Sequence, residues 1–281
     1  MNEALELLRQ DEWRVIDQTS LGPLFHPIQS FAVDDTLCEL VGTGRSPAVA
    51  RAWIHTDAAI LGIADARLPY IEEGVRWLKQ EGYEVIVRTS GGLAVLVDEG
   101  VLNLTLVFPE QERSIDINRG YDAMYEFVKL MFQDMTEDIR AGEIVGSYCP
   151  GSYDLSIGGR KFAGISQRRV KKGVAVQIYL CVNGSGSKRA EVIREFYERA
   201  KKDAATKFTY PDVKPQVMAS LEELLGIPLT IRDTMFRFLQ VLQSVAQRQI
   251  FNSELLPQEI PLYEHYLERV KERNEKWLVE D

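Results

Sequence analysis

Apolar and polar residues alternate through the middle of the chain, and the apolar spacing becomes helical toward its end. The two-residue period of a strand, in runs rich in Val, Ile and Leu, predicts strands at residues 48–54, 58–63, 84–88, 93–97, 101–108 and 174–182. Residues 1–28 are charged and contain two prolines. We interpret them as a charged leader segment.

Helical spacing recurs on both sides of these strands. It predicts helices at residues 29–40, 71–82, 121–132, 189–200, 230–245 and 263–277. Ser220 and Glu223 form a capping box before a short helix that ends at Gly226. Because strands dominate the middle and helices the end, we expect an α+β fold. We divide the chain into an N-terminal segment and helix (1–42), a central domain (43–248) and a C-terminal helix (249–281).

One stretch combines a cysteine with a predicted hairpin. Cys149 lies in a loop of Gly, Ser and Pro, and Gly158-Gly159 is a two-residue turn that requires positive φ. This turn places Ser156 opposite Lys161 on the hairpin. The first strand begins only five residues after Cys149, so a thiol and an ammonium group can meet in one cleft. A neighbouring cation favours the nucleophilic thiolate, although a loop cysteine and a strand lysine are often only structural or solvated.

Composition excludes several classes of function. The net charge is −9 and the pI about 5.1, which argues against sequence-independent binding of nucleic acid. There is no signal-like N-terminus and no apolar run long enough to cross a membrane. Three cysteines are too few for a disulfide scaffold and suit a reducing cytoplasm. The three histidines have no ligand spacing, so no metal site is expected, and His55 is interpreted as a turn residue.

Glycines also mark a second informative segment. Arg88 ends a predicted strand and is placed to meet an anionic or carbonyl group. Ser90, Gly91 and Gly92 follow, and such glycines let a ligand or another backbone approach closely. Leu93 then begins the next strand. Taken alone, a Ser-Gly-Gly segment is more often a turn or bulge than a binding site.

Together the two segments resemble motifs of the biotin/lipoate protein ligase superfamily. The segment from Arg88 to Val95, with Asp98 and Asn103, is similar to the lipoyl-binding loop Arg-x-Ser-Gly-Gly-Gly-Ala-Val…Asp of that family. Residues 154–164 are similar to its Gly-Arg-Lys-x-x-Gly hairpin with an essential Lys. Residues 146–154 further resemble the cysteine-dependent octanoyltransferases of Gram-positive bacteria. The resemblance runs nearly from Trp13 to the C-terminal helix.

The resemblance implies a fold and a set of functional residues. Residues 43–248 would form a biotin/lipoate ligase-like catalytic domain, with mixed and antiparallel sheets packed against helices and a helical C-terminus. Cys149 would be the nucleophile, and Lys161 would activate and orient it. The substrate would be bound by Arg88, Ser90, Gly91, Gly92, Leu93, Asp98 and Gly164. No cofactor is implied. Leu93 replaces the third Gly of the family motif, and our hypothesis is that it denies room to an adenylate.

The implied activity is transfer of an octanoyl group in protein lipoylation, through a thioester on Cys149. The donor would be the octanoylated glycine cleavage H protein, and the acceptors lysines on lipoyl domains of 2-oxoacid dehydrogenases. Alternatives are a sibling octanoyltransferase that uses octanoyl-acyl carrier protein, an ATP-dependent lipoate-protein ligase, and a non-catalytic binder of lipoyl proteins. Cys149 argues against the ligase, and Cys149 with Lys161 argues against the binder.

A basic segment follows the Gly-Gly turn of this acidic chain. Its charged side chains are either simply solvated on the surface of the hairpin and its turn, or they form a basic rim that steers acidic partner domains toward Cys149. The cations are Arg160, Lys161, Arg168, Arg169, Lys171 and Lys172.

Overall fold

The computed structural model of the chain describes residues 3–21, 25–110 and 114–278. Within these residues, two sheets lie at the centre of the fold. The large mixed sheet has the order β11-β1-β2-β6-β10-β9-β8-β7, and the small one β4-β3-β5. The strands are β1 Glu12–Gln18, β2 Ala48–Trp53, β3 Ala58–Leu61, β4 Glu84–Val87, β5 Val95–Val97, β6 Val101–Pro109, β7 Arg140–Ala141, β8 Asp154–Ile157, β9 Arg160–Val170, β10 Gly173–Cys181 and β11 Gln249–Asn252.

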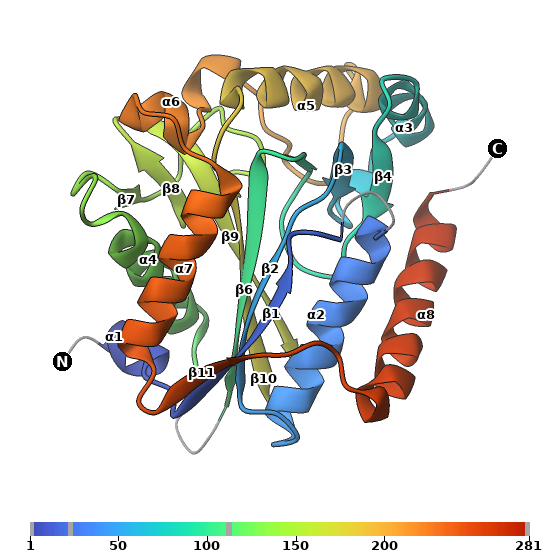
Figure 1. Ribbon diagram of the computed structural model, residues 1–281. Helices are drawn as coiled ribbons and strands as arrows, with labels where there is room; N and C mark the ends of the chain where they lie inside the picture. The colour runs from blue at the N-terminus through green and yellow to red at the C-terminus, as the bar shows by residue number, and fades with distance from the viewer. Residues whose placement is uncertain (1–2, 22–24, 111–113, 279–281) are drawn as a thin grey trace.

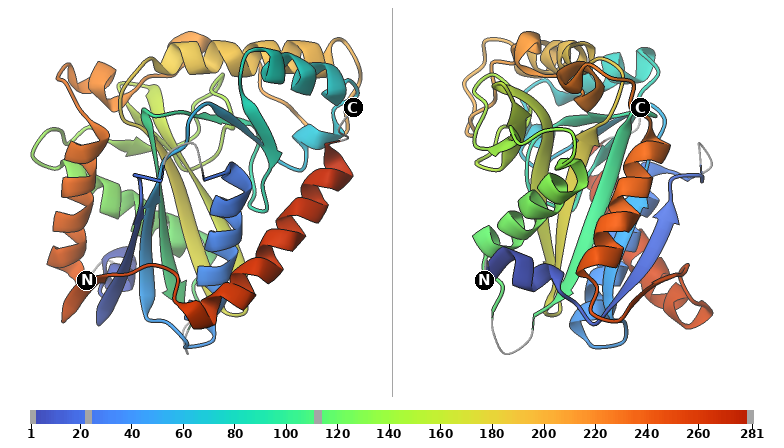
Figure 2. Two further views of the ribbon diagram at one scale, coloured as in Figure 1. Left: turned by 45° about the vertical axis from the view of Figure 1, so that its right-hand side comes forward. Right: turned by 60° about the vertical axis from the view of Figure 1, so that its left-hand side comes forward.

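Helices cover both faces of the large sheet. Figures 1 and 2 show α4 and α7 on one face, α2 and α8 together on the other, and α3 and α5 at one end. The helices are α1 Glu3–Leu8, α2 Pro27–Gly42, α3 Ile71–Gln80, α4 Ile117–Phe132, α5 Gly186–Lys201, α6 Leu221–Leu225, α7 Ile231–Val245 and α8 Ile260–Trp277. The mixed sheet between helical layers is the predicted α+β arrangement.

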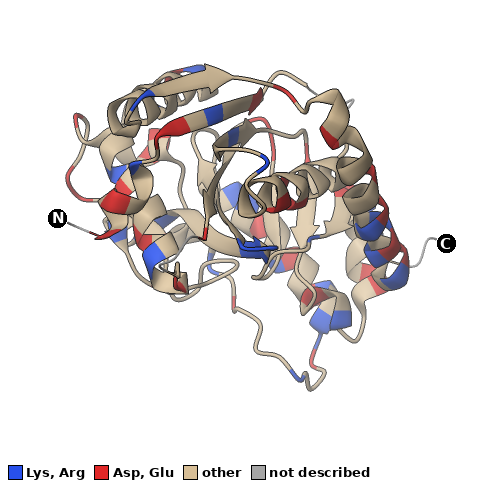
Figure 3. Ribbon diagram, turned by 90° about the horizontal axis from the view of Figure 1, so that it is seen from below, with Lys and Arg blue, Asp and Glu red and all other residues tan. Residues whose placement is uncertain are grey.

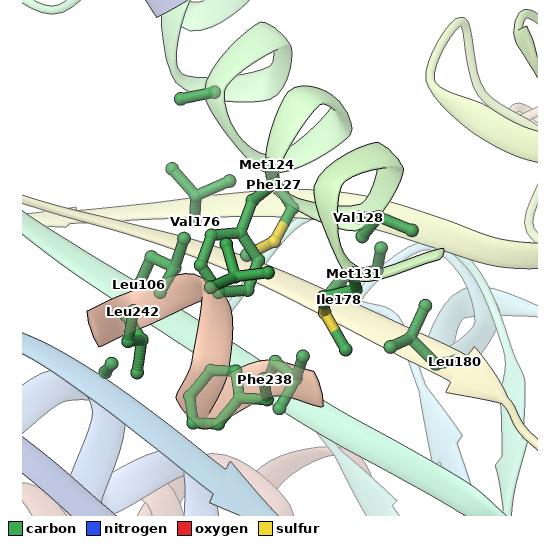
Figure 4. Close-up of a cluster of buried hydrophobic side chains, with 14 of the residues drawn as sticks. Leu106, Met124, Phe127, Val128, Met131, Val176, Ile178, Leu180, Phe238 and Leu242 are labelled. Carbon is green, nitrogen blue, oxygen red and sulfur yellow. The ribbon is translucent and has the colours of Figure 1, made fainter. Parts of the chain in front are cut away.

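Strand alternation gives the large sheet two different faces. On β6 and β10, the even-numbered residues Leu106, Val176 and Ile178 point toward α4 and α7 and form an apolar core with Met124, Phe127 and Phe238 (Figure 4). The odd-numbered residues of the same strands face α2 and the small sheet. Several of them are polar, among them Asn103, Thr105 and Gln177. The functional site is built on this second face.

Most predicted elements are confirmed, one expectation is wrong, and two regular elements near the N-terminus were not predicted. The supposed leader contains α1 and β1, and β1 pairs in parallel with both β2 and β11. His55 lies in the connection between β2 and β3, as predicted. It is also buried, with 3% exposure, and its Nε2 lies 3.0 Å from Ser30 Oγ. The helical spacing of residues 230–245 predicts Phe236 on one apolar face with Met235 and Leu239, but Phe236 is 63% exposed. The helix instead buries Phe238, which contacts Phe127.

The C-terminal helix α8 helps to position the strand that leads into the site. Its buried Asn274 receives a hydrogen bond from the N–H of Val87 at 2.7 Å and donates to the Val87 carbonyl at 3.1 Å. Acidic and basic positions are mixed along α8 near the C-terminal label (Figure 3). β1 belongs to the predicted N-terminal segment, β2 to the central domain and β11 to the C-terminal part, yet β1 pairs with both β2 and β11 in one sheet. The three predicted parts therefore share one sheet. The three-part division stays a prediction.

Candidate active site

Cys149 lies in the loop between β7 and β8, beside the Ser-Gly-Gly segment. Its backbone is left-handed, with φ of 45°, a conformation that costs energy for a residue with a Cβ. The side chain is half-buried. Its Sγ accepts a hydrogen bond from the N–H of Leu93 at 3.1 Å and lies 3.6 Å from Arg88 Nη2. The two predicted motifs therefore meet at the sulfur atom.

The loop that carries Leu93 depends on Gly92. This glycine has φ of +102°, and a Cβ there would lie 2.3 Å from Arg88 Nη2 and 2.9 Å from Cys149 Sγ. Arg88 Nη2 also donates to the Leu93 carbonyl at 2.8 Å, which fixes the loop around the guanidinium. Gly91 differs, because a Cβ there would meet nothing within 4 Å.

Lys161 is completely buried and holds the backbone on either side of the Tyr148–Cys149 peptide. Its Nζ donates to the carbonyl oxygens of Tyr148 at 2.9 Å and Cys149 at 2.8 Å. It also lies 2.8 Å from Asp154 Oδ1. The sulfur of Cys149 is not among its hydrogen-bond partners in the described part of the chain. The predicted meeting of the Lys161 ammonium with the Cys149 thiol is therefore not found. The ammonium contacts the backbone carbonyl of Cys149 instead.

Asp154 completes this buried ion pair and ties the loop together. Its carboxylate accepts hydrogen bonds from the N–H groups of Ile144 at 3.1 Å and Gly151 at 3.1 Å, and from Ser147 Oγ at 3.3 Å. Burial raises the pKa of Asp154, and Lys161 opposes this effect. Lys161 is the register partner of Ser156, and Asp154 lies two residues before Ser156 on β8, so Asp154 and Lys161 share one face of the hairpin.

A second buried carboxyl group supports the segment around Leu93. Asp65 accepts hydrogen bonds from the Gly62 N–H at 2.7 Å and from Tyr197 OH at 2.8 Å. The Tyr197 oxygen in turn accepts from the Ala94 N–H at 3.3 Å. Burial raises the pKa of Asp65 to about 6. Neither Asp65 nor Tyr197 carries a motif, which explains why local sequence patterns did not single them out.

A narrow cavity of about 40 Å³ opens beside Arg88, between the large sheet, the small sheet and α2. Apolar walls come from Phe31, Ile60, Val95 and Val97. Three buried atoms at this cavity have no hydrogen-bond partner among the described residues: Arg88 Nε, Trp53 Nε1 and Tyr179 OH. The cavity is therefore apolar along its walls and carries free hydrogen-bond donors near Arg88.

The structure brings together most of the predicted binding residues. Arg88, Ser90 and Gly164 line the cavity, and a Cβ at Gly164 would lie 2.8 Å from the Tyr179 ring. Leu93 and Gly92 stand beside the sulfur. Trp53 and Tyr179 were missed, since each looks like an ordinary aromatic residue on a strand.

Asp98 lies apart from the cavity. It pairs with Arg189, with Nε to Oδ2 at 2.6 Å, and lines a separate surface pocket with Leu96. Strand alternation explains the difference, because Val95 and Val97 face the cavity whereas Leu96 and Asp98 face the other way. A substrate-binding role for Asp98 stays a prediction.

The basic segment does not form a rim at Cys149. Arg168 pairs with Asp35, with Nε to Oδ1 at 2.7 Å, and Arg169 lies 3.3 Å from Glu110. Both lie on β9, and Arg168 is seven positions beyond Lys161, about 23 Å along a strand. Their charges are neutralised locally at the far end of the strand. This placement does not support the steering hypothesis for these two arginines, which stays a prediction.

Two further observations concern chemistry and environment. Throughout residues 3–21, 25–110 and 114–278, no three His, Cys, Asp or Glu side chains gather closely enough to hold a metal ion. Over the same ranges, no helix combines the length and apolar character needed to cross a bilayer.

Residues 26–243 match the model of the lipoyl protein ligase A/B catalytic domain, and the chain belongs to this family. It is similar to octanoyl-[GcvH]:protein N-octanoyltransferase of Geobacillus kaustophilus, with 58% identity over 96% of this chain and 95% of that protein. Lipoyl-[GcvH]:protein N-lipoyltransferase of Listeria monocytogenes is 50% identical over 99% of this chain and 100% of that protein. The chain is therefore an acyltransferase, as the sequence predicted.

Solved structures confirm the predicted fold. A bipartite lipoate protein ligase from Thermoplasma acidophilum superposes with a TM-score of 0.69 over 96% of this chain and 98% of that chain, at 17% identity. Lipoate-protein ligase A bound with ATP gives a TM-score of 0.70 over 92% and 95%, at 16% identity. At these identities the likeness concerns the fold.

Proposed function

We propose that the chain transfers an octanoyl group from the lysine of the glycine cleavage H protein to a lysine on lipoyl domains of 2-oxoacid dehydrogenases, through a thioester on Cys149. The observation that carries the proposal is the position of Cys149, a half-buried residue whose Sγ lies between the Leu93 N–H and Arg88 Nη2. Arg88 also lines the narrow cavity with apolar walls. Named relatives of high identity over nearly the full length support the donor.

The first half of the reaction forms the thioester. Cys149 Sγ attacks the carbonyl carbon of the donor amide, and the bond from that carbon to the donor lysine nitrogen breaks. Cys149 gives its proton to solvent before the attack, and the leaving amine takes up one proton as it departs, so that atoms and charge balance. Arg88 and the Leu93 N–H, both at the sulfur, stabilise the thiolate before attack. Backbone N–H groups of the glycine-containing loops are candidates for the oxyanion site.

Lys161 has a different role from the one that the sequence suggested. Its three donors face carbonyl and carboxylate oxygens, so the group acts as an ammonium. It fixes the backbone of Cys149 in its left-handed conformation and thereby aims Sγ at the cavity. Lys161 is accordingly a positioning residue, and Arg88 is the cation that acts on the sulfur.

The second half releases the product without a cofactor. The amine of the acceptor lysine attacks the thioester, the carbon–sulfur bond breaks, and the amine proton returns to the sulfur. One amide is exchanged for another, so the overall equilibrium lies near unity and ATP is not required. We place the reaction in the cytoplasm, since the three cysteines are free thiols and reduced thiols suit that compartment.

The test separates the proposed donor from its alternatives. The protein is incubated with octanoyl-H protein or with octanoyl-acyl carrier protein, without ATP, and intact mass reports octanoyl on Cys149. Labelling from the H protein, lost in Cys149→Ala, is the expected result. Labelling only from the carrier protein reassigns the donor. If acylation requires free octanoate and ATP, the chain is a ligase, and the hypothesis that Leu93 excludes an adenylate fails with it.

A further inference from the structure

The face of the large sheet under the cavity is arranged in rows that cross four strands. Trp53, Asn103, Tyr179 and Gly164 are register neighbours on β2, β6, β10 and β9, and we call them the outer row. Two residues further along each strand, Arg51, Thr105, Gln177 and Ser166 form a second set of neighbours, the polar row. The two rows are about 6.6 Å apart.

The outer row is the one nearest to Cys149. Gly164 is the register partner of Asp154, which follows the Cys149 loop. The ring of Tyr179 stacks on that of Tyr148, with centroids 5.9 Å apart. An acyl chain that starts at the Cys149 sulfur therefore passes the outer row first and then meets the polar row.

Hydrogen bonds connect the polar row to a buried carboxylate behind it. Asp34 of α2 is 1% exposed, and its Oδ2 accepts from Thr105 Oγ1 at 3.0 Å and from Gln177 Nε2 at 2.6 Å. Its Oδ1 lies 2.7 Å from Nη1 of the fully buried Arg51. Ser166 Oγ donates to Gln177 Oε1 at 3.3 Å. In contrast to Trp53 and Tyr179 in the outer row, the residues of this row are hydrogen-bonded to one another and to Asp34.

We propose that the polar row sets the maximum length of the acyl chain that the cavity accepts, and so restricts the substrate to the eight-carbon class. This inference rests on the proposed function for the identity of the chain. Thr105, Gln177 and Ser166 line the cavity, so a longer chain has to displace Thr105 or Gln177 from the Asp34 carboxylate, or lie against polar atoms. Losing one hydrogen bond to a buried charge weakens binding roughly 10- to 100-fold.

Binding of free fatty acids tests the length limit without requiring catalysis. The affinities of hexanoic, octanoic, decanoic and dodecanoic acid are measured by titration calorimetry. We expect affinity to rise from six to eight carbons and to fall by about tenfold or more at ten. A purely apolar cavity would instead gain about tenfold for each added pair of methylenes. A continued rise through dodecanoic acid would overturn the proposal.

Two variants assign the limit to the polar row. Gln177→Met and Thr105→Val each remove one hydrogen bond to Asp34 at nearly constant volume, and decanoic acid should bind each about tenfold more tightly than it binds the native chain. Gln167→Met is the matched control, because Gln167 adjoins Ser166 on β9 but lies on the opposite face, where its Nε2 donates to the Ile117 carbonyl at 2.5 Å. If Thr105→Val does not fold, Gln177→Met carries the comparison. Equal length profiles for Gln177→Met and Gln167→Met would overturn the assignment.

Octanoyl transfer from the H protein is measured on the same preparations. If fatty-acid binding shows the length limit but no octanoyl is transferred from the H protein, the proposed function is contradicted and the role of the polar row is still supported. Transfer that proceeds equally well with octanoyl, decanoyl and dodecanoyl donors supports the function and contradicts the length limit.

Discussion

The ammonium group of Lys161 donates a hydrogen bond to the carbonyl oxygen of Cys149 at 2.8 Å, whereas the sulfur of the same residue is contacted by Arg88 and the Leu93 N–H. The buried charge of Lys161 therefore holds the strained Cys149 loop in place and takes no part in a proton transfer. The side chain that does approach the sulfur is Arg88, from the other motif. Positioning and activation are thus divided between two cations, and the two can be separated by mutation.

Replacing Lys161 by Met should abolish transfer and weaken folding. The change leaves the Asp154 carboxylate buried without its partner, which typically costs about 3–5 kcal/mol of unfolding free energy. Urea unfolding and single-turnover transfer measure the two effects. The double variant Lys161→Met/Asp154→Asn should regain much of the stability but not the activity. Activity that returns together with stability would show that Lys161 has no role beyond folding.

Arg88→Gln should slow the reaction of Cys149 with iodoacetamide at neutral pH by about tenfold, because a charge-assisted contact to the thiolate is removed. Arg237→Gln is the control, since Arg237 pairs with Asp134 on the surface and does not contact the loop. Alkylation is followed by intact mass. An Arg88→Gln protein that reacts as fast as the control would assign thiolate stabilisation to the Leu93 N–H alone.

Gly92→Ala should inactivate the protein. Its Cβ would overlap the guanidinium of Arg88 and press on the sulfur of Cys149, and the positive φ adds strain of about 1 kcal/mol or more. Gly91→Ala is a comparison one residue away, with open space around its Cβ. Thermal unfolding should distinguish the two, with a lower melting temperature for Gly92→Ala only. A loss of activity in a fully stable Gly91→Ala would instead report on the bound substrate.

Two buried groups give stability opposite dependences on pH. Burial raises the pKa of Asp65 to about 6 and lowers the pKa of His55 to about 4. The Asp65 contribution is present below about pH 4 and is lost as the pH rises to 6. The His55 contribution is present above about pH 6.5 and is lost as the pH falls to 4. Each amounts to about 3 kcal/mol, so the two nearly cancel in the native chain.

Single variants reveal the two opposing contributions. As the pH is raised from 4 to 6, the unfolding free energy of His55→Gln should fall by up to about 3 kcal/mol relative to that of the native chain. Over the same range, the unfolding free energy of Asp65→Asn should rise by a similar amount. Urea unfolding at several pH values measures both slopes. Curves for the two variants that stay parallel to that of the native chain would contradict this explanation.

Sequence patterns identified the β8–β9 hairpin well, because the register of a hairpin depends on residues that are close together in the sequence. Gly158 and Gly159 fix the register, and the structure pairs Ser156 with Lys161 as expected. In contrast, β1 was missed because charged residues interrupt its apolar pattern. Arg14 is buried only because Glu259 neutralises it at 2.7 Å, and a partner so distant in sequence leaves no local sign.

The site shows the same distinction between local and distant information. The motifs named Cys149, Arg88 and Lys161, but their contacts depend on the left-handed backbone of Cys149 and on the approach of two separate loops. Asp65 and the polar row were beyond prediction, since each is defined by residues from several strands and helices. Residue types with special chemistry could be found from sequence, whereas the direction in which each points could not.

The pairing of β1 with β11 has a consequence for synthesis on the ribosome. Glu12 is the register partner of Gln249, so one side of β1 stays unpaired until residues 249–252 emerge. At typical translation rates this interval is on the order of 10–50 s. The nascent chain thus carries an open strand edge for most of its production, and chaperones that cover such edges should influence its yield more than its final stability.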